Sequence, residues 1–134
     1  CAGLGFSRAD RNSNIRRLAA EAGRLLAAGH AIALIAAINP YEDVRQEIRS
    51  SYPDVKTVFL DCSLEILVNR DTKGLYRRAL LPDDHPGKIS NLTGINDPFE
   101  RPAGPDLVIH TDRQSVEEAS RELLKFILWH YARS

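Results

Sequence analysis

The apolar run AIALIAAI, residues 31–38, constrains the fold of this chain more than any other stretch. It contains no polar side chain, and Gly29 and Pro40 bound it, so its length suits a strand better than a helix. A strand that is apolar on both faces is typical of the interior of a parallel sheet, where helices cover both sides. The run therefore predicts an α/β fold with a strand at 31–38.

Helical and strand-like stretches alternate along the rest of the chain. Ser7 with Asp10, and Ser115 with Glu118, have the spacing of paired residues that cap helix N-termini. The alternation predicts a single domain over residues 1–134, with a three-layer parallel sheet and helices on both faces. In such sheets, ligands bind beyond the carboxyl ends of the strands. Besides the strand above, we expect helices at 7–29, 41–50, 64–69 and from 115 onward, and strands at 56–61 and 106–110.

Residues 70–100 form a connection that is too long and too irregular to serve only as a linker. Turn-forming residues dominate 82–87 and 93–98. Long loops in small domains are usually active-site lids, binding loops or disordered segments. We predict a lid over an anion site, with a solvated, mobile surface loop as the alternative. The cations that favour the lid are Arg70, Lys73, Arg77, Arg78 and Lys88.

The charge balance excludes a general attraction to polyanions. Lysine plus arginine equals aspartate plus glutamate at 18 each, so the sequence predicts no partner among nucleic acids or acidic membranes, and anion binding must be local. Cys1 and Cys62 give no framework of disulfides, and no apolar span of about 20 residues occurs, so we expect a cytoplasmic protein. The sequence has no CxxC, HExxH or clustered histidine pair, and therefore predicts no protein-held metal site.

Arg11 occupies an unusual place in the first predicted helix. It lies four residues before Ile15, on the stripe that faces the core, and it sits in the first turn, where the helix dipole disfavours a cation. An arginine placed against both preferences is a candidate ligand group at a cleft. Pairing with a nearby carboxylate such as Asp10 is the alternative.

Five motifs in order resemble the adenylylsulfate kinase family, and the resemblance covers nearly the whole chain. It implies a P-loop NTPase fold of the nucleoside-kinase-like class. It also implies that the γ-phosphoryl group of ATP, with Mg²⁺, is transferred to the 3′-hydroxyl of adenosine 5′-phosphosulfate in sulfate assimilation. The motifs are GFSRADRNSNIRR at 5–17, NPY at 39–41, RDTKGLY at 70–76, TGINDPFE at 93–100 and TDRQSVEE at 111–118.

The resemblance further implies which residues form the site. Phe6 would stack on the acceptor adenine, while Arg11 and Asn14 would hold the phosphosulfate and sugar. Arg70 would reach the phosphates of ATP, Lys73 would reach the acceptor anion, and the turn at 91–94 would supply backbone donors. The complete set of implied substrate-binding residues is Phe6, Arg11, Asn14, Ile38, Asn39, Lys73, Leu92, Thr93 and Gly94 for the acceptor, with Arg70 for ATP.

Each of these roles has a plainer alternative. Phe6 could fasten the helix entry against the core, as a hydrophobic staple does. Arg70 could satisfy carbonyl groups at a helix C-terminus. Asn14 could lie on an exposed helix face with no role.

The chain departs from the family pattern in three places. Asn39 stands where the family usually has serine, and residues 82–88 are an insertion in the lid. Ser90 and Leu92 stand where the family usually has lysine and a stacking phenylalanine. Leucine lacks an aromatic face, so only one side of the adenine is expected to be stacked. Lys88 is a candidate replacement for the missing lysine.

A phosphate loop of the pattern GxxxxGK[ST] does not occur in this sequence, and Gly87-Lys88 is followed by Ile89. The family carries this loop, and an acidic DGD segment that would supply the base, before the GFS motif. We therefore expect both to precede Cys1, the catalytic residues to lie outside this chain, and the chain alone to be inactive.

The expected partners are ATP and adenosine 5′-phosphosulfate, with assembly as a homodimer or fusion to other sulfate-activation domains. Two alternatives remain open. One is a related small-molecule kinase with an altered acceptor, and the other is a degenerate, non-catalytic kinase-like regulatory module.

Overall fold

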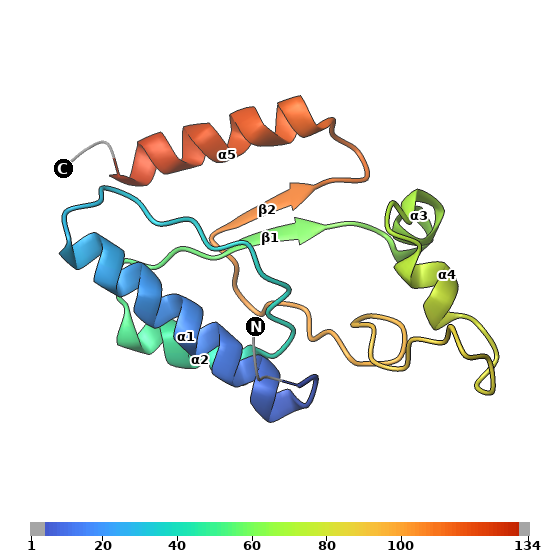
Figure 1. Ribbon diagram of the computed structural model, residues 1–134. Coiled ribbons are helices and arrows are strands. Elements are labelled where there is room, and N and C mark those ends of the chain that lie inside the picture. Colours follow the sequence, from blue (N-terminus) through green and yellow to red (C-terminus); the bar gives the residue numbers. More distant parts are fainter. Residues whose placement is uncertain (1–4, 132–134) are drawn as a thin grey trace.

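The computed structural model describes residues 5–131, and its elements follow the predicted alternation closely (Figure 1). Helix and strand boundaries fall within a few residues of those expected. The elements of the described chain are α1 (Arg8–Ala27), α2 (Glu42–Ser51), β1 (Val58–Asp61), α3 (Leu64–Arg70), α4 (Leu75–Ala79), β2 (Leu107–His110) and α5 (Val116–Tyr131).

Side-chain caps start the two long helices where the sequence predicts them. The hydroxyl of Ser7 accepts a hydrogen bond from the Asp10 N–H at 3.1 Å, ahead of α1. Ahead of α5, the Ser115 hydroxyl accepts from the Glu118 N–H at 3.1 Å, and the Glu118 carboxylate accepts from the Ser115 N–H at 3.1 Å. Both capping predictions are therefore confirmed.

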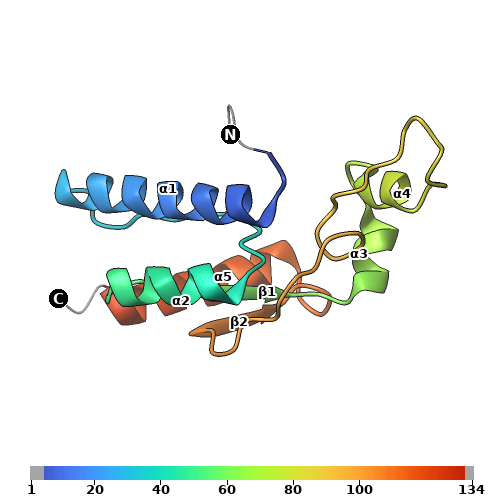
Figure 2. The same cartoon turned by 90° about the horizontal axis from the view of Figure 1, so that it is seen from below.

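Helices α1 and α2 run alongside one another and share a small core (Figure 2). Ile15 from α1 packs with Tyr41 and Val44, and Val44 is completely buried. The Arg16–Glu47 ion pair joins the rims of the two helices at 2.7 Å. The two helices thereby form one layer of the molecule.

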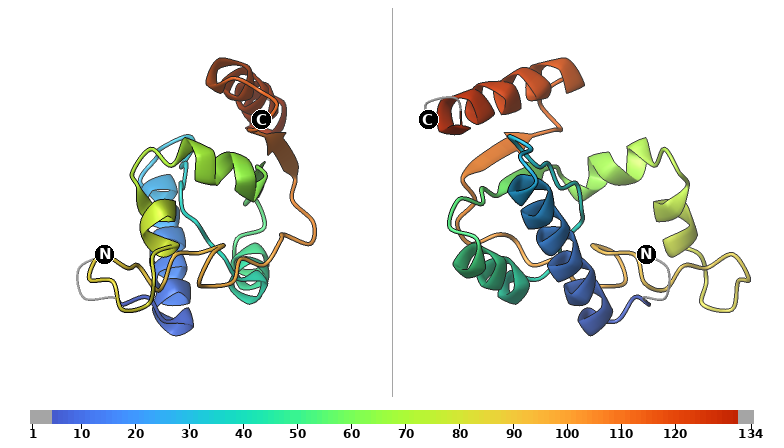
Figure 3. Two further views of the ribbon diagram at one scale, coloured as in Figure 1. Left: turned by 90° about the vertical axis from the view of Figure 1, so that its right-hand side faces the viewer. Right: turned by 60° about the vertical axis from the view of Figure 1, so that its left-hand side comes forward.

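The strands form a two-stranded parallel sheet between helical layers. β1 and β2 pair in register from Val58 opposite Leu107 to Asp61 opposite His110. α5 lies on one side of the strands, with α1 and α2 on the other (Figures 1 and 3). α3 and α4 lie beyond the carboxyl ends of the strands. The α/β class with parallel strands and helices on both faces is therefore confirmed.

The predicted strand at 31–38 is wrong for the described residues. The segment carries no strand assignment and makes no backbone hydrogen bonds with β1 or β2. Leu34 and Ile38 are 73% and 62% exposed. A strand exists only where a neighbour completes its hydrogen bonds, and apolar content alone does not supply that neighbour.

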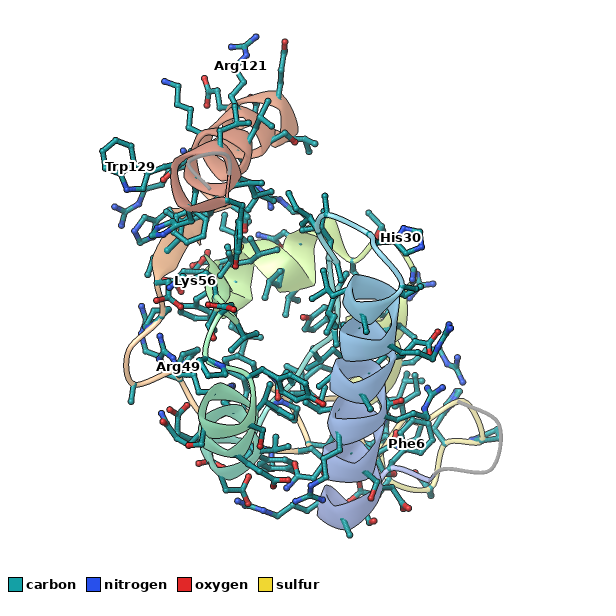
Figure 4. The ribbon with its side chains drawn as sticks, turned by 90° about the vertical axis from the view of Figure 1, so that its left-hand side faces the viewer. Phe6, His30, Arg49, Lys56, Arg121 and Trp129 are labelled. Atoms are coloured by element: carbon teal, nitrogen blue, oxygen red, sulfur yellow. The ribbon has the colours of Figure 1, made fainter. Side chains whose placement is uncertain are left out.

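α5 packs against β2, and several of its large apolar side chains remain exposed among charged ones. Val116, Leu124, Leu128 and Trp129 are all exposed, and Figure 4 shows Trp129 on this helix. Nevertheless, none of the helices within residues 5–131 combines the length and apolar character that a membrane span requires.

Candidate functional site

Arg11 joins the start of α1 to the turn that ends the lid. Its Nε donates to the carbonyl of Phe6 at 2.9 Å, and its Nη1 donates to the hydroxyl of Thr93 at 2.6 Å. Its Nη2 donates to the Asn91 carbonyl and to the Asp97 carboxylate, both at 2.7 Å. The side chain is only 11% exposed. Four of the five N–H groups of this guanidinium are thus used by the protein.

The sequence correctly marked Arg11 as unusual, but its partners are not those that were expected. Asp10, the suggested alternative partner, accepts instead from the Ser7 hydroxyl at 2.6 Å. The carboxylate that Arg11 meets is Asp97, far along the chain. Sequence spacing identifies near neighbours only, and this contact depends on how the lid returns to α1.

Phe6 and Asn14 lie on either side of Arg11 in the sequence and differ in their surroundings. Phe6 is 66% exposed, with the Arg11 guanidinium 5.8 Å from its ring centre, so it does not fasten α1 to the core. Figure 4 shows Phe6 at the start of α1, beside the lid segment. Asn14 is half-buried, and its Oδ1 accepts from Arg17 at 2.8 Å. The aromatic face of Phe6 is therefore available to a ligand.

The turn after the lid is closed by its own backbone. The carbonyl of Leu92 accepts from the N–H groups of Ile95, Asn96 and Asp97 at 3.0–3.1 Å. Gly94 has a φ of 90°, a conformation that favours glycine, and its N–H donates to the Asp97 carbonyl at 2.7 Å.

This closure limits the expectation that the turn at 91–94 supplies backbone donors to a ligand. The N–H of Gly94 is used within the turn, and the N–H of Leu92 lies 3.4 Å from Oδ1 of Asn96. Of the four N–H groups, those of Asn91 and Thr93 remain for a ligand. The other two N–H groups, those of Leu92 and Gly94, stabilise the turn itself.

The beginning of the lid is folded by Asp71. Its two carboxylate oxygens accept from the N–H groups of Tyr76 and Arg77 at 3.0 Å each, at the start of α4. These backbone hydrogen bonds, that of Arg77 foremost, hold the pKa of Asp71 below its usual value. Gly74 precedes α4 with a φ of 65°, which a side chain would strain. Asp71 and Gly74 therefore shape the turn that carries Lys73.

Arg70 and Lys73 line a hollow of about 220 Å³ between α3 and α4. Arg70 Nη2 donates to the carbonyl of Thr111, just after β2, at 2.8 Å, rather than to the last carbonyls of its own helix. Lys73 is exposed. The lining of the hollow includes neither Phe6 nor Arg11, so the predicted residues form two clusters. The hollow is lined by Leu67, Arg70, Asp71, Thr72, Lys73, Leu75 and Tyr76.

Lys88 does not replace the missing lysine as an open cation. Its ammonium donates to the carbonyl of Leu81 at 2.6 Å and pairs with Asp83 at 3.3 Å, and the side chain is only 15% exposed. Arg78 Nε also donates to the carbonyl of Gly87 at 3.0 Å. The inserted segment is therefore folded back on itself and on α4.

Ile38 and Asn39 end the apolar segment, and the next residue, Pro40, contacts the far end of the lid. Ile38 is 62% exposed, while Oδ1 of Asn39 is buried without a hydrogen-bond partner among the described residues. The carbonyl of Asn39 accepts two hydrogen bonds from Arg45. The carbonyl of Pro40 accepts from the Glu100 N–H at 2.8 Å. Sequence reasoning missed Arg45, although its place beside Val44 on the inner face of α2 was a usable signal.

A further group of charged side chains lies at the carboxyl end of the sheet. Asp61 accepts from Arg101 at 2.8 and 3.3 Å, and its Oδ2 lies 3.5 Å from Nδ1 of His110. The Arg101 hydrogen bond holds the pKa of Asp61 below its usual value. Throughout residues 5–131, no group of three or more His, Cys, Asp or Glu side chains is arranged to hold a metal ion.

The sequence and the fold both match known proteins. Residues 1–110 match the adenylylsulphate kinase family. The chain is 44% identical over 122 residues to the adenylyl-sulfate kinase of Deinococcus deserti, covering 91% of this chain and 64% of that protein. It is 43% identical to the probable bifunctional SAT/APS kinase 2 of Sorangium cellulosum, covering 91% of this chain and 20% of that protein.

A solved structure shows the same fold. The Mycobacterium tuberculosis APS kinase in complex with AMPPNP and APS superposes with a TM-score of 0.78 and 37% sequence identity, over 94% of this chain and 71% of that chain. The present chain spans just under two thirds of its Deinococcus relative, which is 64% covered. The family match, the identities and the superposition agree on one conclusion: the chain belongs to the adenylylsulphate kinase family.

Proposed function

We propose that this chain serves the transfer of the γ-phosphoryl group of ATP to the 3′-hydroxyl of adenosine 5′-phosphosulfate. One observation carries the proposal furthest: Arg11 brings the GFS motif and the TGI motif into contact, with the exposed ring of Phe6 beside them. Support also comes from the Mycobacterium relative, whose structure contains APS and an ATP analogue.

The proposed role of each residue follows from its exposure and its position in the structure. Phe6 offers an aromatic face to the acceptor adenine. Lys73 is an exposed cation for the acceptor anion, and Arg70, beside the same hollow, serves the phosphates of ATP. Phosphoryl transfer depends mainly on positioning and on stabilising charge, which these groups supply. The phosphate-loop pattern and the DGD segment are not found in this sequence.

Arg11 has a different role in this proposal from that of a simple anion ligand. Because four of its N–H groups are bound to the protein, it chiefly holds the acceptor pocket together, and one N–H of Nη1 remains for the substrate. The other residues proposed to contact the acceptor are Asn14, Ile38, Asn39, Leu92, Thr93 and Gly94.

Mg²⁺ is proposed to accompany ATP rather than to be held by this chain. The described residues contain no cluster of metal-ligating side chains, and the sequence lacks the phosphate-loop hydroxyl that binds the ion in P-loop kinases.

Assembly and location are part of the same proposal. The Sorangium relative is named as bifunctional, which supports fusion to another sulfate-activation domain as one form, and a homodimer is the other. Cys62 is a free thiol, in keeping with the reducing cytoplasm as the place of action.

The proposal is tested by supplying the full-length protein, rather than residues 1–134 alone, with ATP and ³⁵S-labelled adenosine 5′-phosphosulfate and separating the products. A labelled 3′-phosphorylated product supports the proposal, and its absence from an intact preparation overturns it. Calorimetric titration with the acceptor, with and without a non-hydrolysable ATP analogue, separates a catalytic protein from a module that only binds. A panel of other nucleotide acceptors tests whether Asn39 and Leu92 have altered the preference.

A further inference from the structure

The buried side chain of Arg45 donates two hydrogen bonds to the carbonyl oxygen of Asn39. Nε and Nη2 of Arg45 lie 2.9 and 2.7 Å from that oxygen. Nη1 donates to the Glu42 carboxylate at 2.8 Å, and the Arg45 side chain is only 6% exposed. A planar fork of donors fixes both the direction and the distance of the group that it binds.

Asn39 is a residue that needs such support. Its φ is 46°, inside the left-handed region. A residue with a Cβ is strained in this left-handed region, and asparagine tolerates it better than most. The preceding segment, 31–38, makes no ladder hydrogen bonds that could hold the chain in place. The hydrogen bonds from Arg45 therefore hold Asn39 in place, because the backbone of 31–38 makes none that could do so.

The same guanidinium reaches the end of the lid. It lies 5.2 Å from the centre of the Phe99 ring, and the next residue, Glu100, donates its N–H to the Pro40 carbonyl at 2.8 Å. Arg45 thus contacts Asn39 on one side and the segment that leaves the lid on the other. Movement of either segment would change the position of this one side chain.

Glu42 keeps Arg45 in place. Its carboxylate accepts from Arg45 and, through the other oxygen, from Gln46 at 2.6 Å. The hydrogen bond from Arg45, followed by that from Gln46, lowers the pKa of Glu42. Glu42 is therefore charged near neutral pH, and its contact with the guanidinium is a charge-assisted one.

We infer that Arg45 is a positioning residue of the acceptor site, which holds Asn39 and the end of the lid in the arrangement that adenosine 5′-phosphosulfate requires. The inference rests on the proposed function and deepens it. We assign Arg45 no contact with the substrate, because its side chain is only 6% exposed and three of its N–H groups are bound to Asn39 and Glu42.

Two lysine substitutions on α2 provide a matched test. Arg45→Lys keeps the charge but loses the fork, so we expect the KM for adenosine 5′-phosphosulfate to rise about tenfold. The KM for ATP and the kcat should change by less than about twofold. Arg49→Lys is the control, because Arg49 makes comparable contacts one turn later, to the Gly104 carbonyl at 2.6 Å and Asp106 at 2.9 Å. It should leave both KM values unchanged.

A second variant covers the case in which Arg45→Lys does not fold, as judged by thermal melting. Glu42→Gln removes the charge that orients Arg45 but keeps a hydrogen-bond acceptor, and we expect a smaller rise in the acceptor KM. An NMR shift of the Asn39 amide signal should accompany both changes.

The outcomes distinguish this inference from the proposed function. Equal rises in both KM values, or the same effect from Arg49→Lys, would show that Arg45 serves stability alone. A wild-type protein that neither binds nor phosphorylates adenosine 5′-phosphosulfate would instead overturn the proposed function, and this inference with it. Selective loss of acceptor affinity in Arg45→Lys and Glu42→Gln, with Arg49→Lys unchanged, supports both.

Discussion

The guanidinium of Arg11 lies 2.6 Å from the hydroxyl of Thr93, although 82 residues separate the two in sequence. The contact is partly buried, and Asp97 completes it as an ion pair at 2.7 Å. Partly buried charge pairs are screened less by salt than exposed ones. The start of α1 and the turn after the lid therefore form one unit at the candidate site.

Replacing Arg11 with alanine should release that turn. The change leaves Asp97 and three other acceptors without a donor, so we expect a loss of about 2 kcal/mol in stability and a comparable loss in acceptor binding. Hydrogen exchange of the amides of 91–97 should become faster, which mass spectrometry can measure. Arg24→Ala is the control, since Arg24 forms an exposed pair with Glu21 on the same helix. Unchanged exchange in the Arg11 variant would contradict the role assigned to it.

The start of the lid should depend on pH through Asp71. Its pKa is lowered in the folded protein, so its stabilising effect on α4 is fully present above the ordinary carboxyl pKa and is lost as the pH falls through the folded value. NMR chemical shifts of residues 75–79 should report the loss of helix in acid. In Asp71→Asn this transition should disappear, and an unaltered transition there would assign it to another group.

Gly94 provides a test of the turn conformation itself. Alanine at this position must keep a φ of 90°, and no atom lies within 4 Å of the added Cβ, so the cost of about 1–2 kcal/mol is purely conformational. Acceptor affinity should fall with it. Gly104→Ala is the matched control, because its Cβ would meet only Arg49 Nη1 at an ordinary 3.9 Å. Thermal melting and calorimetry measure both effects, and equal behaviour of the two variants would exclude a special need at Gly94.

Lys73 and Lys88 should behave differently although both are lid cations. Lys73→Ala removes an exposed charge beside the hollow, and we expect about a tenfold loss of acceptor affinity. Lys88→Ala releases the inserted loop from Leu81 and Asp83, and should increase its cleavage by protease while leaving that affinity unchanged. The reverse pattern would return the ligand role to Lys88.

Local chemistry explains which features the sequence could predict. Ser7 and Ser115 cap helices through atoms within a few residues, so spacing alone located both starts. Asp71 and Gly74 likewise shape the beginning of the lid from within their own motif.

Features that depend on distant partners were beyond the reach of the sequence. Nothing in the spacing joins Arg11 to Asp97, or reveals that Asn39 has a positive φ and is held by Arg45. The strand expected at 31–38 failed for the same reason, since a strand is a relation between two segments. The expectation that Lys88 replaces the missing lysine failed because the sequence shows that a charge is present but not which carboxylate pairs with it.

The extended segment 31–38 has a practical consequence for work with this chain. Its backbone groups carry no hydrogen bonds in the described structure, and apolar side chains such as Leu34 flank them. Unpaired backbone groups of this kind can template the formation of intermolecular sheets. The turbidity of samples should therefore rise steeply with protein concentration. A charged residue within the segment, as in Leu34→Lys, should oppose this sheet formation and keep concentrated samples clear.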